Sequence, residues 1–135
     1  RRARPEETGI GDMYELKIIT QFAAAHQLRG YDGACERLHG HNWKVEVFVE
    51  GPSLRNDGLL LDFKDIKRAT LKVLERLDHR LLNEIEPFGS LNPSSENIAR
   101  HLFDALSSEL NQGDVRVSQV TAWESETACA TYRAS

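Results

Sequence analysis

A cysteine and three histidines, Cys35, His26, His39 and His41, are the residues of this chain best suited to chemistry. Side chains alternate between the two faces of a β-strand, so His39 and His41 would point the same way. His26 ends an apolar run that also has the composition of a strand. Three imidazole ligands would leave the fourth position of a tetrahedral zinc open, as in catalytic rather than structural zinc sites. Two histidines in one strand also occur by chance, so the prediction of a zinc centre depends on the whole set.

Two groups could move protons beside such a metal. Cys35 lies among small and charged residues that indicate a loop, where a thiol near Arg37 and a metal is readily deprotonated and could act as a base. Glu36 could take that role, or be a solvated loop charge. Asp78 directly precedes His79, and a carboxylate that orients an imidazole suits proton transfer. Alternatively, Asp78 caps a backbone turn and His79 is solvated.

Glu124 follows the end of a predicted strand. Its carboxylate could accept two hydrogen bonds from the amino-pyrimidinone edge of a ring, or it could be a surface charge, as expected for Glu126. His101 lies within a predicted helix, where we expect a structural or solvent-facing role.

The elements that position these residues follow from hydrophobic periodicity. Trp43 and Val45 share the odd-numbered face of their strand with both histidines of the pair, so the histidines lie on a buried face. The order β-β-α-α-β-β, without a βαβ crossover, predicts an α+β fold with a four-stranded antiparallel sheet and two helices on one face. The predicted elements are strands over 14–25 and 42–50, a helix from the N-cap Asp62 to about Leu77, a helix that starts within 92–96 with Pro93 at or near its first turn, and strands over 115–123 and 127–132.

Composition excludes several classes of protein. The chain has 135 residues, 40% hydrophobic and 28% charged, which fits one domain with its own core. The net charge of −4 argues against nucleic acid as a partner, and no apolar run reaches the roughly 18 residues of a membrane span. We expect residues 1–12 to be a flexible leader, residues 13–135 to form the domain, and Cys35 and Cys129 to be reduced thiols of a cytoplasmic protein.

Six segments, in this order and at compatible spacing, give the chain a family resemblance. It resembles the 6-pyruvoyl-tetrahydropterin synthase family, and most closely the 6-carboxy-tetrahydropterin synthase branch of the queuosine and deazapurine pathway. The resemblance extends from Met13 to about Arg133. The segments are Ala24–His26, Cys35–His41, Leu61–Phe63, Leu77–His79, Asn92–Asn97 and Trp123–Glu124.

The resemblance implies a role for each matched position. Cys35 would be the catalytic cysteine, Asp78 and His79 the acid–base pair, and Glu124 the anchor of the pterin ring. The implied zinc ligands are His26, His39 and His41.

The resemblance also implies an assembly and a reaction. In the tunnelling fold three subunits close a barrel and two trimers stack into a homohexamer, with active sites between subunits. Closure removes the open sheet edges of a single subunit. The implied activity is a zinc-dependent lyase that converts 7,8-dihydroneopterin triphosphate to 6-carboxy-5,6,7,8-tetrahydropterin, with release of acetaldehyde and triphosphate.

Alternative functions remain open at this point. Within the family they are formation of a 6-pyruvoyl product or cleavage of the side chain, with a larger part for Glu36. From another class, a non-catalytic oligomer could bind a pterin or purine. The candidate phosphate contacts are Arg29, Arg37, Lys44 and Arg80, each of which could equally be a surface charge.

Overall fold

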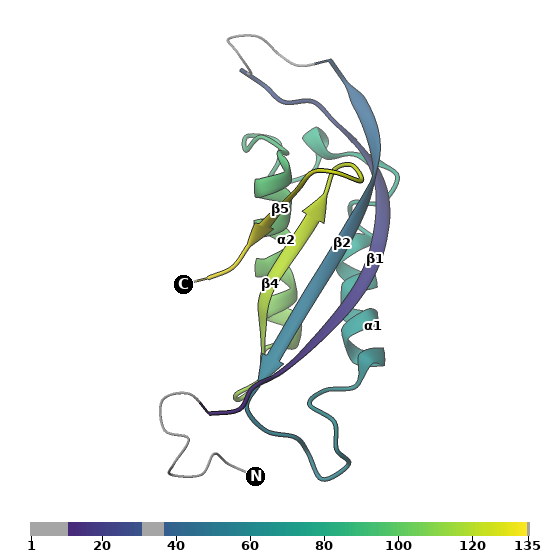
Figure 1. Cartoon of the computed structure of the whole chain (residues 1–135). Coiled ribbons are helices and arrows are strands. Elements are labelled where there is room, and N and C mark those ends of the chain that lie inside the picture. Colours follow the sequence, from purple (N-terminus) through teal and green to yellow (C-terminus); the bar gives the residue numbers. More distant parts are fainter. Residues whose placement is uncertain (1–10, 31–36, 135) are drawn as a thin grey trace.

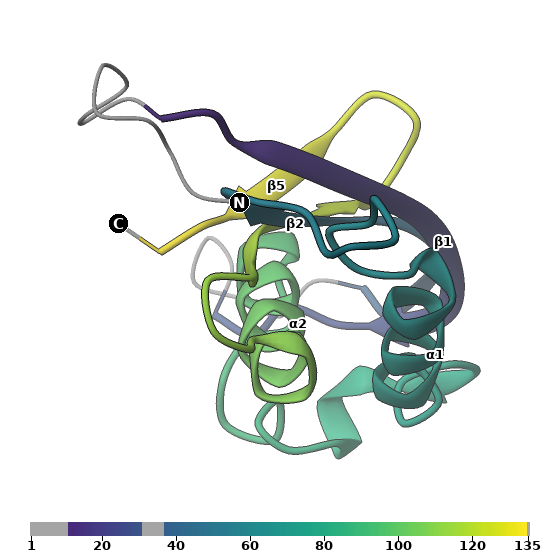
Figure 2. The same ribbon diagram turned by 90° about the horizontal axis from the view of Figure 1, so that it is seen from below.

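A computed structural model describes residues 11–30 and 37–134, and within these ranges it contains a five-stranded sheet in the order β3-β1-β2-β4-β5. Both long helices pack on one face of this sheet, as Figures 1 and 2 show from two directions. The elements are β1 (Tyr14–His26), β2 (His39–Gly51), α1 (Phe63–Leu74), β3 (Arg80–Leu81), the short 3-10 helix η2 (Leu82–Glu84), α2 (Ser95–Leu110), β4 (Arg116–Trp123) and β5 (Cys129–Tyr132).

The predicted α+β class is confirmed, but the predicted four-stranded antiparallel sheet is wrong in one respect. A fifth strand, β3, pairs in parallel with β1 through Ala24 and Arg80, in the segment between the two helices, for which no strand was predicted. The chain reaches this edge because His79 adopts a left-handed φ of 60° and its N–H binds the carbonyl of Ala23. A two-residue strand shows no alternation of side chains, so sequence periodicity could not reveal it.

The antiparallel ladder of β1 and β2 is the longest element of the sheet. It pairs Tyr14 with Gly51 at one end and His26 with His39 at the other. Alternation places Trp43, Val45, Val47 and Val49 of β2 toward the helices, and all four are fully buried. Burial of each such side chain contributes about 1.5–3 kcal/mol. The ladder therefore holds its histidine-bearing end in register through the core.

Side-chain caps fix where the helices begin. The carboxylate of Asp62 accepts the N–H of Lys64 at 2.9 Å, which confirms it as the N-cap of α1. In α2 the N-cap is Ser94, whose hydroxyl accepts the N–H of Asn97 at 3.2 Å. Pro93 directly precedes this cap, near the first turn as predicted, whereas α1 ends at Leu74, earlier than predicted.

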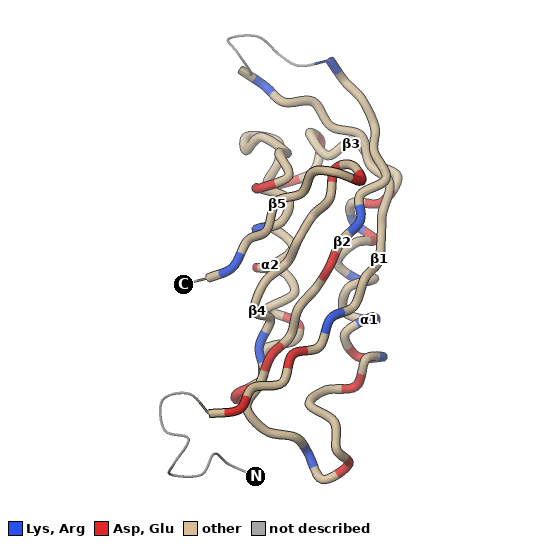
Figure 3. Tube along the Cα trace, viewed as in Figure 1, with Lys and Arg blue, Asp and Glu red and all other residues tan. Residues whose placement is uncertain are grey.

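The charges of the described chain are mixed along its elements. Figure 3 shows acidic and basic residues interspersed over the strands and helices. None of the helices in residues 11–30 and 37–134 is both long and apolar enough to cross a membrane.

Candidate metal centre

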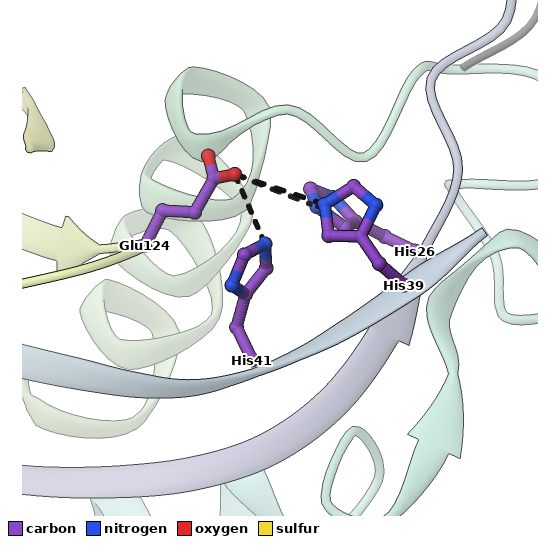
Figure 4. A group of neighbouring side chains, drawn as sticks. All are labelled: His26, His39, His41 and Glu124. Carbon is purple, nitrogen blue, oxygen red and sulfur yellow. Dashed lines mark hydrogen bonds and ion pairs between the residues drawn. The ribbon is translucent and has the colours of Figure 1, made fainter. Parts of the chain in front are cut away.

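The three predicted metal ligands lie together at one end of the β1–β2 ladder. His26 ends β1, whereas His39 and His41 begin β2, and all three lie on the helix-facing side of the sheet. The Nε2 atoms of His26 and His39 are 3.2 Å apart. Glu124, directly after β4, completes the group, in which one ligand atom of each residue lies within 4.8 Å of every other (Figure 4).

Backbone carbonyls orient two of the imidazoles. Nδ1 of His26 lies 2.7 Å from the carbonyl oxygen of Pro93, and Nδ1 of His39 lies 2.8 Å from that of Arg37. A carbonyl can only accept, so in each ring Nδ1 carries the proton and donates it. Nε2 then keeps its lone pair, which is the arrangement that carbonyl partners impose on metal-binding histidines. Both lone pairs therefore belong to the atoms that converge.

An aromatic side chain forms the floor of the group. The Trp43 ring lies edge-on to the rings of His26 and His41, with centroids 5.1 and 5.4 Å away. Trp43 also stacks on Phe22 at 6.1 Å between centroids. Trp43 and His26 are almost completely buried, whereas His39, His41 and Glu124 are partly exposed.

His41 has a buried ring nitrogen that lacks a hydrogen bond. Its Nε2 is buried, and Glu124 Oε2, although 3.0 Å away, does not have the geometry of a hydrogen-bond acceptor for it. Burial lowers the pKa of His41, and the nearby Glu124 carboxylate opposes this only in part. A neutral, desolvated nitrogen among two other imidazoles fits a divalent metal ion such as zinc, which prefers nitrogen and carboxylate ligands. The group could therefore hold a metal ion.

Glu124, which the sequence predicted to bind the ring of a substrate, lies directly beside the three histidines. Its Oε2 is 3.9 Å from the Nε2 atoms of His26 and His39. Its Oε1 accepts a hydrogen bond of 3.1 Å from the hydroxyl of Ser95, the first residue of α2. Ser95 was missed by sequence reasoning, since nothing in a serine at a helix start indicates a contact with a turn 29 residues away.

Asp78 and His79, the predicted acid–base pair, contact each other but are not part of the metal-ligand group. Asp78 Oδ2 lies 3.0 Å from Nδ1 of His79, and Asp78 Oδ1 accepts the N–H of Ala23 at 2.9 Å. These contacts, first the one with Ala23, hold the pKa of Asp78 below its ordinary value. The side chain of His79 is 81% exposed.

His79 lines a hollow of about 460 Å³ together with Ala23, Gly40, His41 and Asn42. Neither Asp78 nor His79 belongs to the group of ligand atoms that the described residues bring together. The predicted catalytic Cys35, and Glu36 beside it, lie outside the described residues.

Two asparagines that sequence reasoning did not single out hold the chain beyond His26. The amide of Asn83 both accepts from and donates to the backbone of Gln27, at 2.9 and 2.7 Å, and Asn92 does the same for Arg29, at 2.7 and 2.8 Å. The guanidinium of Arg29 donates to the carbonyl of Phe88 at 2.6 Å. Arg29, one of the candidate phosphate contacts, thus has a structural role.

The sequence of the chain also matches a known protein family. The family model described as "6-pyruvoyl tetrahydropterin synthase" matches residues 15–135, nearly the whole chain. The chain belongs to this family. The resemblance inferred from the sequence is therefore confirmed, and the chain is a pterin synthase-type enzyme.

Relatives of this family member carry more than one name. A protein of Archaeoglobus fulgidus, provisionally named 6-carboxy-5,6,7,8-tetrahydropterin synthase, is 40% identical over 105 residues, which cover 77% of this chain and 86% of the relative. The dihydroneopterin monophosphate aldolase of Pyrococcus furiosus is 37% identical over 103 residues, covering 76% and 82%. The structure of Caenorhabditis elegans 6-pyruvoyl tetrahydropterin synthase superposes with a TM-score of 0.82 at 25% identity, covering 93% of this chain and 98% of that one.

Proposed function

We propose that this family member is a zinc-dependent lyase that converts 7,8-dihydroneopterin triphosphate to 6-carboxy-5,6,7,8-tetrahydropterin, acetaldehyde and triphosphate. The observation that carries the proposal is the convergence of three imidazole Nε2 atoms, two of them with their tautomers set by backbone carbonyls. The name of the Archaeoglobus fulgidus relative supports this product.

The histidines would bind the metal, and Glu124 would bind the substrate. His26, His39 and His41 would hold zinc, which supplies Lewis acidity that makes C–H protons beside a bound hydroxyl easier to remove. Glu124 would accept two N–H donors from the pterin ring and fix the side chain of the substrate near the imidazoles, which lowers the barrier by orientation.

Cys35 and the pair of Asp78 and His79 would transfer the protons. Cys35, as a thiolate, would remove a proton from the substrate side chain. His79 would return or remove a proton on the other side, with Asp78 accepting from its Nδ1 so that Nε2 faces the substrate. The reaction consumes one water and requires no redox cofactor, because the substrate's own carbons exchange oxidation state.

The position of His79 supports an oligomer with shared sites. In the described residues, the edge of β1 that faces away from β2 is paired only through its short contact with β3, and β5 is the last strand on the other side of the sheet. Exposed strand edges favour pairing with another chain. We propose that three copies close a barrel, that two trimers form a homohexamer in the cytoplasm, and that Asp78 and His79 of one subunit serve the metal centre of another.

Product analysis after replacement of the cysteine tests the function. The Cys35→Ala variant should lose turnover of dihydroneopterin triphosphate and keep one zinc per subunit, measured by mass spectrometry and by elemental analysis. Cys129→Ala is the matched control, because Cys129 is an exposed thiol on the edge strand, and it should retain activity. A fully active Cys35→Ala variant would refute the role of Cys35.

A second candidate is cleavage of the substrate side chain to a hydroxymethyl-pterin, with Glu36 as a base. The name of the Pyrococcus furiosus relative favours it. The same assay separates the candidates by product mass, and a 6-pyruvoyl product would be detected as well. Binding of the pterin without any product would instead indicate a non-catalytic binding protein.

A further inference from the structure

The carboxylate of Glu124 has two oxygens in two different environments. Oε2 faces the three imidazole Nε2 atoms, at 3.0 Å from that of His41 and 3.9 Å from the other two (Figure 4). Oε1 is bound by the Ser95 hydroxyl at 3.1 Å. The carboxylate is therefore close enough to the three imidazoles to share a metal ion with them.

We propose that Glu124 is the fourth metal ligand of the substrate-free enzyme, that Ser95 positions it, and that the ring of an incoming pterin displaces it and so opens the metal. This inference rests on the proposed function, in which Glu124 binds the ring. It adds a resting state in which the same carboxylate closes the coordination sphere.

The charges and partners of the site favour this resting state. Three neutral imidazoles leave both charges of a divalent ion uncompensated, and Glu124 is the acidic side chain in the described group. Its backbone N–H binds the carbonyl of Ala128 at 3.1 Å, which fixes the turn between β4 and β5. The carboxylate also lies beside the first residue of α2, where the helix dipole stabilises negative charge.

Ser95 determines which oxygen faces the metal. A hydroxyl donor on Oε1 leaves Oε2 as the oxygen with an unoccupied lone pair toward the imidazoles. Partners that orient metal ligands in this way contribute about 10–100-fold in metal affinity. Ser95 is therefore a positioning residue, which acts on the metal through Glu124.

Ring binding and metal coordination then compete for one group. An amino-pyrimidinone edge presents two parallel N–H donors and needs both oxygens of the carboxylate, whereas Oε1 is bound by Ser95 and, in the proposed resting state, Oε2 binds the metal. Binding of the ring must therefore weaken the bond of Glu124 to the metal. By linkage, the bound metal lowers the affinity of the protein for the ring by the same factor by which the bound ring lowers the affinity of the protein for the metal.

Metal titrations of the full chain test the ligand. The dissociation constant of Zn²⁺, measured by competition with a chromophoric chelator, should rise about 10–100-fold in Glu124→Gln. Glu126→Gln, an exposed charge in the same turn, should match the wild type. Ser95→Ala should weaken binding about 10-fold, and Ser95→Thr, which keeps the hydroxyl, should restore it.

Cobalt spectroscopy tests the displacement. In the Co²⁺-loaded wild type, unsubstituted pterin, which has no side chain to reach the metal, should change the visible absorption because Glu124 leaves and water enters. In Glu124→Gln the same addition should leave the spectrum unchanged.

The proposal can be overturned in two distinguishable ways. Equal zinc affinity of Glu124→Gln and the wild type, or a wild-type cobalt spectrum that pterin leaves unchanged, overturns the fourth ligand and spares the zinc lyase. A wild type that binds no metal overturns both.

Discussion

Replacement of His41 by leucine should invert the order of stability between the metal-free and the metal-loaded protein. In the metal-free protein, Nε2 of His41 is a buried polar atom without a hydrogen bond, and such an atom costs about 1–3 kcal/mol. The side chain is 22% exposed and lies near Glu124, so the lower limit of about 1 kcal/mol applies. Leucine has a similar volume, so the packing against Trp43 is retained and the polar atom is removed.

The expected shifts follow from these numbers. With the metal chelated, His41→Leu should melt about 4 °C above the wild type, because 1 kcal/mol corresponds to about 4 °C at this chain length. Zinc at 100 times its dissociation constant should stabilise the wild type by about 2.7 kcal/mol, or about 10 °C. The variant should gain nothing from zinc, so the wild type becomes the more stable protein.

Differential scanning calorimetry with EDTA and with zinc, at one fixed protein concentration, measures both shifts. Asn42→Ala is the matched control, because Asn42 neighbours His41 on the other face of β2, and it should keep the full zinc-dependent shift. The reasoning is refuted if His41→Leu melts below the wild type in EDTA, or if zinc still stabilises it.

Three further predictions concern residues outside the metal group. Asp78→Asn should reduce turnover and, in calorimetry across pH, remove a stabilisation that is present above the ordinary aspartate pKa of about 3.9 and lost as the pH falls through the lowered pKa of Asp78. Burial lowers the pKa of His101, so the unfolded chain binds more protons and stability should fall below about pH 6.5; His101→Gln should flatten that slope of Tm against pH. Asn92→Ala removes both hydrogen bonds to the Arg29 backbone and should cost about 2 kcal/mol in urea unfolding, and an unchanged midpoint would contradict this.

The long elements could be predicted because their side chains repeat. Alternation in β2 placed His39 and His41 on the face of Trp43, and the ladder confirms this with His26 opposite His39. The acidic cap of α1 was equally visible in the sequence. His101, predicted to be structural or solvent-facing, is structural: it lies edge-on to Phe88 at 5.3 Å.

What could not be predicted depends on contacts between distant segments. The parallel strand β3 forms because the backbone at His79 turns through a left-handed conformation. Few residues adopt this conformation, and the periodicity of the side chains does not indicate it. Ser95 reaches Glu124 only because α2 packs beside the turn that follows β4. The position of His79 outside the group of metal-ligand atoms could likewise not be predicted, since sequence order does not state which loop residues the fold brings together.

The backbone at Ala23 connects the acid–base pair, Asp78 and His79, to the strand that carries the metal ligand His26. Asp78 accepts the N–H of Ala23, while the N–H of His79 donates to its carbonyl, so the acid–base pair is attached to β1 at a single residue. His26 follows three residues later on the same strand. The distance between the pair and the metal ligands of one subunit is therefore set by a rigid strand. It follows that the geometry of a shared site depends on how neighbouring subunits pair, and that variants which weaken subunit pairing should lose activity while their zinc affinity is retained.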